Sequence, residues 1–485
     1  MITYIESILQ HFRKCFSREA SFKWFVILIF GLMVRSDHLG VTAVIRELVL
    51  DPGWYVPFLN FFRSSAFTLS DIRKEWYRVV KAAAPLTRVC HRAIMVGDGL
   101  KSSKEGLRMP GVKKMKQESE TSSKPQYIHG HFFGALGVVV SNMGKRFCLP
   151  LKINLQDGVR EPASWQLKKG IVELTPKNHI EQIVESAFEA AEFIGNSFLL
   201  LDGYFLSQTL LKVLDRLNQK RRRARDSEDQ LVIITRAKKN CRGFLNPRKK
   251  LKGRPSKKGK EVHLAELFQY KKRFTKATAW MYGQNETISY YCINLLWGPG
   301  LYRKLRFVLV EWKGNRLIFV STDLTIKPVT VIELYARRFS CEELFRELKQ
   351  EMGAFCYRFW TKSHPKLSHF RKKDLPDILS SITDPREQRN ILKTIKAIET
   401  FVACAAIAMG TLQMLALNAD LSKDVLKCRY LRQYSSRTPS EASVMYYLRR
   451  NLFSFLLKKP DSFITRYILE KQEPASKLKN HSSAA

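Results

Sequence analysis

Three acidic residues stand where a metal ion could be held. Asp98 follows the apolar run RAIMVG, Asp202 follows SFLLL, and Glu342 lies in the helical segment YARRFSCEELFRELK. Cleaving a DNA phosphodiester requires an activated hydroxyl and neutralisation of the phosphate charge, and two divalent ions about 3.5–4 Å apart supply both. Because Mg²⁺ prefers carboxylate oxygens, these residues predict a catalytic site for two Mg²⁺ ions, with Mn²⁺ as a substitute.

Each acidic residue of the first pair is followed directly by glycine. An Asp-Gly pair alone also fits an ordinary turn, since it is a common turn dipeptide. Both pairs, however, end strand-like apolar runs, and a strand end opens into a cleft where glycine permits close approach of a substrate backbone. We therefore assign Asp98 and Asp202 to catalysis rather than to turns.

The helical segment around the third acid carries a polar face. Its members are Tyr335, Arg338, Glu342 and Lys349. On a continuous helix at about 100° per residue they fall within an arc of roughly 60°. This face suits a metal ion beside a phosphate, although an ordinary amphipathic helix has a polar face too. A capping-box spacing that begins at Ser340 would restart the helix there.

The elements that must position these residues follow a simple order. Strand-like runs occupy 92–99, 131–141 and 145–155, followed by a helix at 179–195, a strand at 196–205, a helix at 206–219 and a strand at 229–239. Three successive strands followed by alternating helices and strands predict a mixed α/β sheet flanked by helices. The order is similar to that of the ribonuclease-H-like fold.

The rest of the chain divides into parts that differ in hydropathy pattern and charge. The predicted parts are a helical DNA-binding region (1–88), the first part of the catalytic core (89–245), a basic loop with a β-rich insertion (246–324), a second part of the core carrying Glu342 (325–365) and a helical C-terminal region (366–485). The stretch FFRSSAF at 61–67 fits either recognition of a DNA end or a core-packing elbow. The basic residues of 219–261 fit a solvated loop that could also follow a phosphate backbone.

The charge of the chain points to a polyanionic partner. Lys and Arg number 83 against 44 Asp and Glu, a net charge of +39, and the pI is about 10.0. Such an excess is typical of nucleic-acid binding. Ribosomal packing, membrane-surface binding and a basic tail are the alternatives, of which the tail is disfavoured because the basic residues run through the whole length.

Cysteine usage and hydropathy indicate a cytoplasmic protein. The nine cysteines contain no C-x-x-C pair, which supports neither a zinc finger nor a disulfide framework. The apolar run 24–34 is too short to span a membrane, and 401–417 contains Thr411 and Gln413. We expect the longer run to be a buried helix and the protein to have no membrane role.

The four polar residues have the spacing of a known family motif. Tyr335-x2-Arg338-x3-Glu342-x6-Lys349 resembles the Y-x2-R-x3-E-x6-K motif of bacterial DDE transposases of the insertion-sequence-four group. Members carry a ribonuclease-H-like domain interrupted by a β-rich insertion between the second Asp and the Glu. The separation of 140 residues between Asp202 and Glu342 (342 − 202) leaves room for such an insertion.

The resemblance implies roles for individual residues. Asp98, Asp202 and Glu342 would be the metal ligands, and Tyr335, Arg338, Lys349 and Arg236 would contact DNA. Relatives flip a base onto an aromatic residue of the insertion, a part that Trp297 or Trp280 could play, although both also fit the core. His129 and His131 could bind a metal on a strand, but a structural role is favoured because no partner ligand is near in sequence.

The predicted function is cut-and-paste DNA transposition: hydrolysis at the ends of an insertion sequence and strand transfer into target DNA. The resemblance implies terminal inverted repeats as substrate, a homodimer in the synaptic complex, and a bacterial, nucleoid-associated location. Two alternatives remain open: a catalytically silent, transposase-derived DNA-binding protein, and another ribonuclease-H-like nuclease such as a resolvase.

Overall fold

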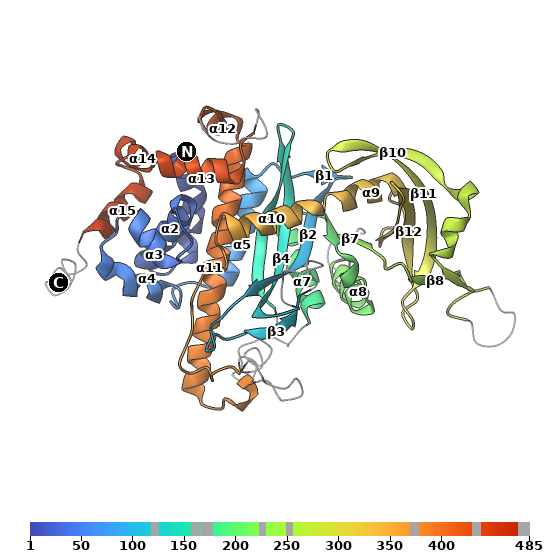
Figure 1. The fold of residues 1–485 in the computed structure, drawn as a ribbon, viewed down its shortest axis with the longest axis horizontal. Coiled ribbons are helices and arrows are strands. Elements are labelled where there is room, and N and C mark those ends of the chain that lie inside the picture. The colour runs from blue at the N-terminus through green and yellow to red at the C-terminus, as the bar shows by residue number, and fades with distance from the viewer. Residues whose placement is uncertain are drawn as a thin grey trace.

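The computed structural model describes residues 1–117, 126–156, 165, 178–222, 229–248, 256–368, 378–428 and 438–473 (Figure 1). Of the basic stretch predicted at 219–261, residues 223–228 and 249–255 lie outside the described ranges. The molecule is elongated, with a helical layer formed by both ends of the chain, a central sheet, and a β-rich part at the far end. The layer and the β-rich part therefore flank the sheet that carries the acidic residues.

The helices gather in three places along the chain. They are α1 (Ile2–Gln10), α2 (Glu19–Val34), α3 (Val41–Glu47), α4 (Tyr55–Phe61), α5 (Leu69–Ala83), α7 (His179–Ile194), α8 (Gln208–Arg222), α9 (Pro328–Ala336), α10 (Phe339–Gln350), α11 (Pro385–Leu417), α12 (Ala419–Leu426), α13 (Glu441–Arg450), α14 (Leu452–Lys458) and α15 (Phe463–Gln472).

The strands join into one 13-stranded sheet within the described residues. They are β1 (Arg88–Val89), β2 (Arg92–Ser103), β3 (Lys113–Lys116), β4 (Tyr127–Asn142), β5 (Lys145–Leu155), β6 (Ser197–Leu201), β7 (Leu231–Arg236), β8 (Arg242–Phe244), β9 (Glu261–His263), β10 (Thr275–Met281), β11 (Gln284–Trp297), β12 (Arg303–Trp312) and β13 (Asn315–Ser321).

The central part of the sheet has the strand order β5-β4-β2-β6-β7. Strands β5, β4 and β2 pair antiparallel, whereas β2, β6 and β7 run parallel. Parallel strands are covered on both faces and therefore consist of continuous apolar residues: every residue of β6 is buried, as are the first five of β7. The predicted succession of strands and helices from β2 to β7 is present, with β3 as an additional strand.

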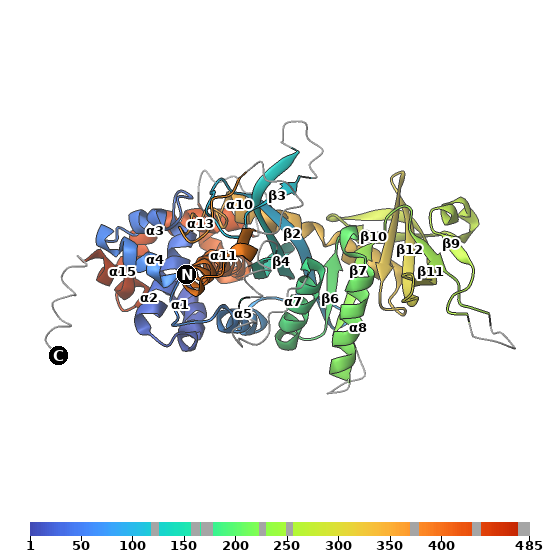
Figure 2. The ribbon, with the colours of Figure 1, turned by 90° about the horizontal axis from the view of Figure 1, so that it is seen from below.

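Helices cover both faces of this central sheet. Figure 2 shows α7 and α8 on one side and α10 on the other. Since successive residues of a strand point to opposite faces, Gly97 of β2 faces Ile183 of α7, and its neighbour Asp98 faces Arg338, at the start of α10. The alternation of β2 thus decides that the carboxylate of Asp98 lies on the α10 side.

The β-rich part continues the central sheet. Strands β10 to β13 form an antiparallel meander, and β13 pairs with β7. Two of its hairpins close through a non-glycine residue followed by glycine, both at positive φ, at Tyr282-Gly283 and Lys313-Gly314, which is the backbone of a two-residue type I′ turn. Strand β8, assigned to the core by the predicted boundary at 245, pairs with β11 and β9 and so belongs to this part.

The helical layer joins segments far apart in sequence. Helix α2 packs against α11, α13 and α15, and nearly all of its residues are buried. Helix α11 is long and apolar enough to cross a membrane by length and composition, yet its apolar window is entirely buried in the fold. The predicted buried helix at 401–417 is part of it.

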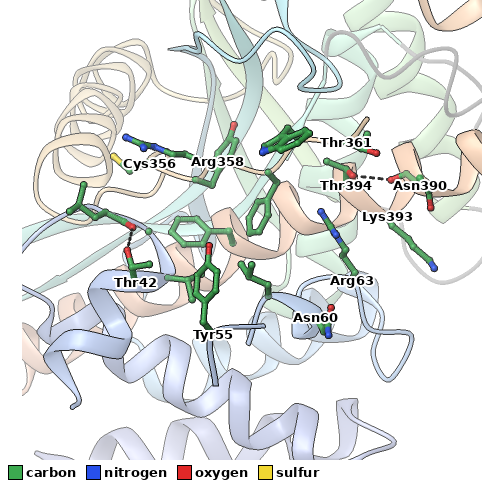
Figure 3. Close-up of a pocket in the computed structure, with 18 of the residues that line it drawn as sticks. Thr42, Tyr55, Asn60, Arg63, Cys356, Arg358, Thr361, Asn390, Lys393 and Thr394 are labelled. Carbon is green, nitrogen blue, oxygen red and sulfur yellow. Dashed lines mark hydrogen bonds between the residues drawn. The ribbon is translucent and has the colours of Figure 1, made fainter. Parts of the chain in front are cut away.

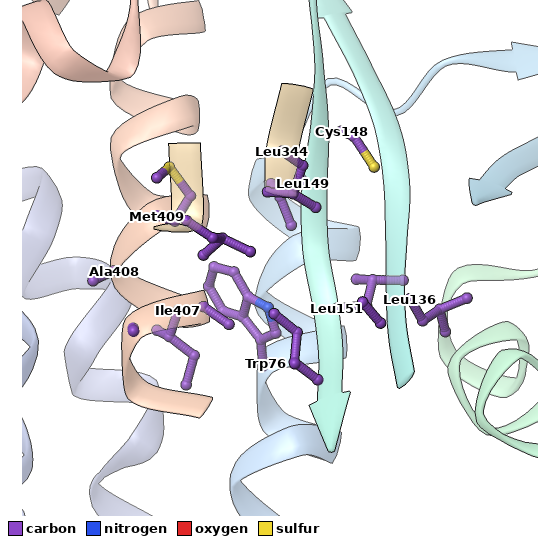
Figure 4. Packing of buried hydrophobic residues seen from close by; sticks show 14 of the residues in the cluster. Trp76, Leu136, Cys148, Leu149, Leu151, Leu344, Ile407, Ala408 and Met409 are labelled. Atoms are coloured by element: carbon purple, nitrogen blue, oxygen red, sulfur yellow. The ribbon is translucent and has the colours of Figure 1, made fainter. Parts of the chain in front are cut away.

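The core between this layer and the central sheet centres on Trp76 of α5 (Figure 4). Its indole N–H donates a 2.8 Å hydrogen bond to the carbonyl oxygen of Pro150 in β5. Gly410 of α11 lies against the ring, and a Cβ atom there would come within 2.5 Å of it. Leu149 and Ile407 close the other sides, so one side chain joins α5, α11 and the sheet.

The aromatic residues of the stretch at 61–67 pack in the core. Phe61, Phe62 and Phe67 are buried, and the ring of Phe62 lies 5.0 Å from that of Phe359. Arg63 alone among the long side chains of this stretch is exposed. Of the two interpretations, the core-packing elbow fits the aromatic residues.

Candidate active site formed by three carboxylates

Asp98 and Asp202 lie next to each other on adjacent parallel strands. The register of β2 and β6 pairs Gly97 with Leu201, so the residue that follows on each strand is an acid. The prediction that Asp98 ends its strand is wrong, because β2 continues to Ser103 through its pairing with β4. Only β6 ends here. Asp202 is the first residue after it and therefore lies beside Asp98.

The glycines after the two acids have internal packing reasons. A Cβ atom on Gly99 would come within 2.6 Å of the ring of Phe132, and one on Gly203 within 2.9 Å of the carbonyl oxygen of Arg236. Contacts within the protein therefore account for both glycines, and the approach of a substrate backbone stays a prediction.

The segment that carries the third acid consists of two helices. Helix α9 ends at Ala336 and α10 begins at Phe339, and the backbone N–H groups of 337, 338, 340 and 341 bond to carbonyls three residues earlier. Such bonds tighten the turn locally. The expected continuous α-helix is thus interrupted, and Ser340 does not cap a new helix, because its hydroxyl donates to the carbonyl of Arg337.

Arg338 stands between two of the three carboxylates. One terminal nitrogen of its guanidinium lies 2.9 Å from Oδ2 of Asp98, and the other lies 2.8 Å from Oε1 of Glu342. Burial opposes the charge of this guanidinium, but the negative charges of the nearby carboxylates outweigh it and raise the pKa of Arg338 above its ordinary value. Arg338 therefore remains a cation that bridges strand β2 and helix α10.

Tyr335 connects the remaining carboxylate to the same group. Its hydroxyl lies 3.4 Å from Oδ1 of Asp202, which accepts the hydrogen bond. Burial raises the pKa of Tyr335 to about 12, so the phenol stays protonated and keeps its donor. Its ring packs 4.7 Å from that of Phe319 in β13, which fixes the direction of the hydroxyl.

Burial, with smaller contributions from the charges of Asp202 and Glu342, raises the pKa of Asp98 to about 6, although Arg338 and the backbone N–H of Gly99 act to lower it. The raised pKa means that burial and the neighbouring carboxylates disfavour the ionised form of Asp98 more than Arg338 and Gly99 favour it. One arginine therefore does not neutralise this cluster of three acids, and an additional cation would stabilise it.

The donor set suits a hard divalent ion only in part. Carboxylate oxygens are the ligands that Mg²⁺ prefers, and Asp98 within β2 lies next to Asp202, which directly follows the paired strand β6. Within the described ranges, however, no three His, Cys, Asp or Glu side chains converge as metal ligands. Glu342 is directed to Arg338 instead, so it could reach a metal held by the two aspartates only after that ion pair opens.

Two predicted DNA contacts, Arg236 and Lys349, do not belong to the group formed by the three acids, Arg338 and Tyr335. They lie at different distances from it. Arg236 lies at the end of β7, and its charge lowers the pKa of Tyr335; the hydroxyl of the preceding Thr235 donates to the carbonyl of Asp202. Lys349 is exposed and lies seven residues beyond Glu342, about 10 Å along α10. The structure thus places Arg236 beside the carboxylates and Lys349 two turns away.

The tryptophans of the β-rich part have different surroundings. Trp297 is half-buried and packs against the apolar cluster of that part, as the core interpretation expects. Trp280 is 42% exposed, and its backbone N–H donates to Glu333 of α9. Trp280 is therefore the better placed of the two to meet a ligand.

His131 has a structural role. It is fully buried, with Nδ1 2.6 Å from the hydroxyl of Tyr357 and Nε2 2.8 Å from the carbonyl of Pro110. Burial lowers its pKa to about 3, which keeps the imidazole neutral. Both ring nitrogens are thus engaged, and the favoured interpretation of this histidine fits its surroundings.

No protein-family model and no curated protein matches the chain. Among solved structures, the NurA nuclease from Sulfolobus solfataricus is similar over 60% of this chain and 94% of that chain, with 10% sequence identity and a TM-score of 0.21. A TM-score of this size does not establish a shared fold, so the residues of this chain alone carry the functional conclusion.

The raised pKa of Asp98 predicts how the stability of the metal-free protein depends on pH. Its folded state binds the proton more tightly than the unfolded state, so its contribution to stability is present below about pH 4 and is lost as the pH rises through about 6. Relative to Asp98→Asn, the wild type should lose about 1–3 kcal/mol of unfolding free energy between about pH 4 and about pH 7. Urea unfolding of both proteins measures this; a difference that stays constant with pH contradicts it.

Proposed function

We propose that the protein is a metal-dependent DNA transposase, which cleaves the ends of an insertion sequence and joins them to target DNA. The observation that carries the proposal is the arrangement of three acids from distant parts of the chain. Asp98 on β2 lies next to Asp202, which directly follows the paired strand β6. Glu342 is joined to Asp98 through the guanidinium of Arg338. The excess of 83 basic over 44 acidic residues supports DNA as the substrate.

The strand order supports a ribonuclease-H-like catalytic domain. In β5-β4-β2-β6-β7, three antiparallel strands are followed by two parallel ones, with Asp98 on β2 and Asp202 directly after β6. The β-rich part lies in sequence between Asp202 and Glu342, where the resembled transposases carry their insertion. Both features belong to the proposal and rest on topology, since no relative supports them.

In the proposed reaction, Asp98, Asp202 and Glu342 would hold two Mg²⁺ ions, which when bound supply Lewis acidity and an activated hydroxyl. Tyr335 orients the carboxylate of Asp202 through its hydroxyl. Arg338 bridges two acids without DNA, and its planar fork also fits the oxygens of a phosphate. A DNA phosphate that captures this guanidinium would release Asp98 and Glu342 to serve as ligands.

A catalytically silent DNA-binding protein is the second candidate. The ion pairs of Arg338 with Asp98 and Glu342 favour it, because they satisfy two of the acids without any metal. Such a protein would bind the same DNA ends but leave them intact. A resolvase, the other nuclease considered from the sequence, would cut without joining.

A strand-transfer assay separates these functions. The substrate is a pre-cut DNA fragment ending in the gene's own flanking sequence, mixed with a target plasmid and Mg²⁺. We expect joined products with the wild type and with Glu343→Ala, an exposed neighbour on the same helix, and none with Glu342→Ala. Joining by Glu342→Ala at the wild-type rate, or cleavage without joining by the wild type, contradicts the proposal.

A further inference from the structure

A second site lies away from the carboxylates. A cavity of about 990 Å³ opens between the helical layer and the chain that follows α10 (Figure 3), at the upper end of the usual range for ligand pockets of about 300–1,000 Å³. Its lining comes from α3 and α4, from the segment 356–362 and from α11. Glu342 lies near the start of α10, and this 12-residue helix is about 18 Å long, so the cavity lies beyond the opposite end of the helix from the catalytic acid.

The extended segment 356–362 builds one wall by alternation. Tyr357 and Phe359 are buried, their rings stack 6.3 Å apart, and both contact Phe401 of α11. Side chains of an extended chain alternate between two sides, so Arg358 and Trp360 turn outward and line the cavity. The sequence signal for this segment is the pattern YRFW at 357–360, in which aromatic residues surround one arginine.

The cavity is strongly basic. Its lining cations are Arg63, Arg358, Lys362 and Lys393, and no Asp or Glu is among the lining residues. All four side chains are exposed. In the part of the chain that the structure describes, no ion pair joins any of them to a carboxylate. Four uncompensated positive charges around one cavity favour a ligand with several negative charges, such as a run of phosphates.

Two exposed aromatic rings in the lining indicate a second property of the ligand. Trp360 is 52% exposed and Tyr55 is 41% exposed, and both line the cavity. A basic groove with exposed aromatic side chains is the usual arrangement for binding single-stranded nucleic acid, in which bases stack on the rings. A duplex offers these rings no base faces, because its bases stack on one another. An unpaired strand is therefore the polyanion that uses both the charges and the rings.

We propose that this cavity binds single-stranded DNA, with phosphates held by Arg63, Arg358, Lys362 and Lys393 and unpaired bases stacked on Trp360 and Tyr55. The site is independent of the proposed catalysis, because none of the three acids lines it.

Fluorescence anisotropy of labelled poly-dT of about 15 nucleotides tests the proposal with the full-length protein. We expect Trp360→Ala to weaken binding by about tenfold or more, as the loss of one stacked base predicts, and Trp360→Phe to restore most of the affinity. Lys393→Ala should reduce the slope of log affinity against log salt by about 0.7, the contribution of one single-strand phosphate.

Matched variants outside the cavity provide the control. Phe453→Ala removes an exposed aromatic ring of α14 and Lys458→Ala an exposed cation of the same helix, and both should bind poly-dT like the wild type. The affinity of Trp360→Ala for a blunt duplex of equal length should be unchanged. Wild-type binding of poly-dT by a folded Trp360→Ala, or an equal loss for poly-dT and duplex, would overturn the proposal, whether or not the protein transposes DNA.

Discussion

Asp202→Asn should lower DNA excision by about a thousand-fold or more, while the fold remains intact. The amide has nearly the shape of the carboxylate, and its oxygen can still accept the hydrogen bond from Tyr335. What is lost is one negative charge beside Asp98. A divalent ion held by both would lose a ligand charge, and metal stabilisation of a phosphoryl transition state is worth several kcal/mol, of which about 4 correspond to a thousand-fold in rate.

The measurement is excision from a plasmid in which the gene keeps its own flanking DNA. Asp420→Asn serves as the matched control, since this carboxylate lies on the surface of α12 with its side chain 88% exposed; it should excise like the wild type. The circular dichroism spectrum and urea midpoint of Asp202→Asn show whether the variant is folded. Excision by folded Asp202→Asn within tenfold of the wild type would remove this acid from catalysis.

Trp76→Ala should reduce the free energy of unfolding by about 4 kcal/mol or more. The side chain is 1% exposed, and truncating a buried tryptophan costs about 3–5 kcal/mol through lost burial and the remaining cavity. The carbonyl of Pro150 would also lose the indole N–H, and an unsatisfied buried acceptor adds about 1–3 kcal/mol. The ring joins α5, α11 and the sheet, so little can move in to fill the space.

Two further variants separate the contributions at this position. Trp76→Phe retains most of the packing but removes the hydrogen bond, and it should lie between the wild type and Trp76→Ala. Trp280→Ala removes a ring that is 42% exposed, and surface changes of this kind usually alter stability by less than about 0.5 kcal/mol. Urea unfolding followed by circular dichroism gives all three values. Equal midpoints for Trp76→Ala and Trp280→Ala would contradict the proposed packing role.

The elements of the central sheet could be predicted well from the sequence, because their buried positions carry mostly apolar residues. Strand β5 begins and ends where the apolar pattern of 145–155 does, and α7 (His179–Ile194) matches the predicted helix to within one residue. A strand covered on both faces, such as β6, must be apolar throughout, which no turn or loop imitates. The short strands β1 and β3 have no such pattern, so the sequence does not predict them.

The details of the candidate site depend on pairing between distant segments and are harder to predict from the sequence. Asp98 reads as a strand end because glycine flanks it, yet β2 continues through pairing with β4, and a single sequence does not reveal a partner strand. The break between α9 and α10 is marked by neither proline nor glycine. The position of Arg338 between two acids follows from where α10 lies on the sheet, which periodicity does not determine.

The late position of α10 in the chain has a consequence during synthesis. The strands that carry Asp98 and Asp202 leave the ribosome first, and Glu342 follows only after 140 further residues, which include the whole β-rich part. If the three acids act together in the proposed reaction, a nascent chain that has not reached residue 342 holds only two of them and cannot cut DNA. Synthesis of the β-rich part therefore delays the first cut.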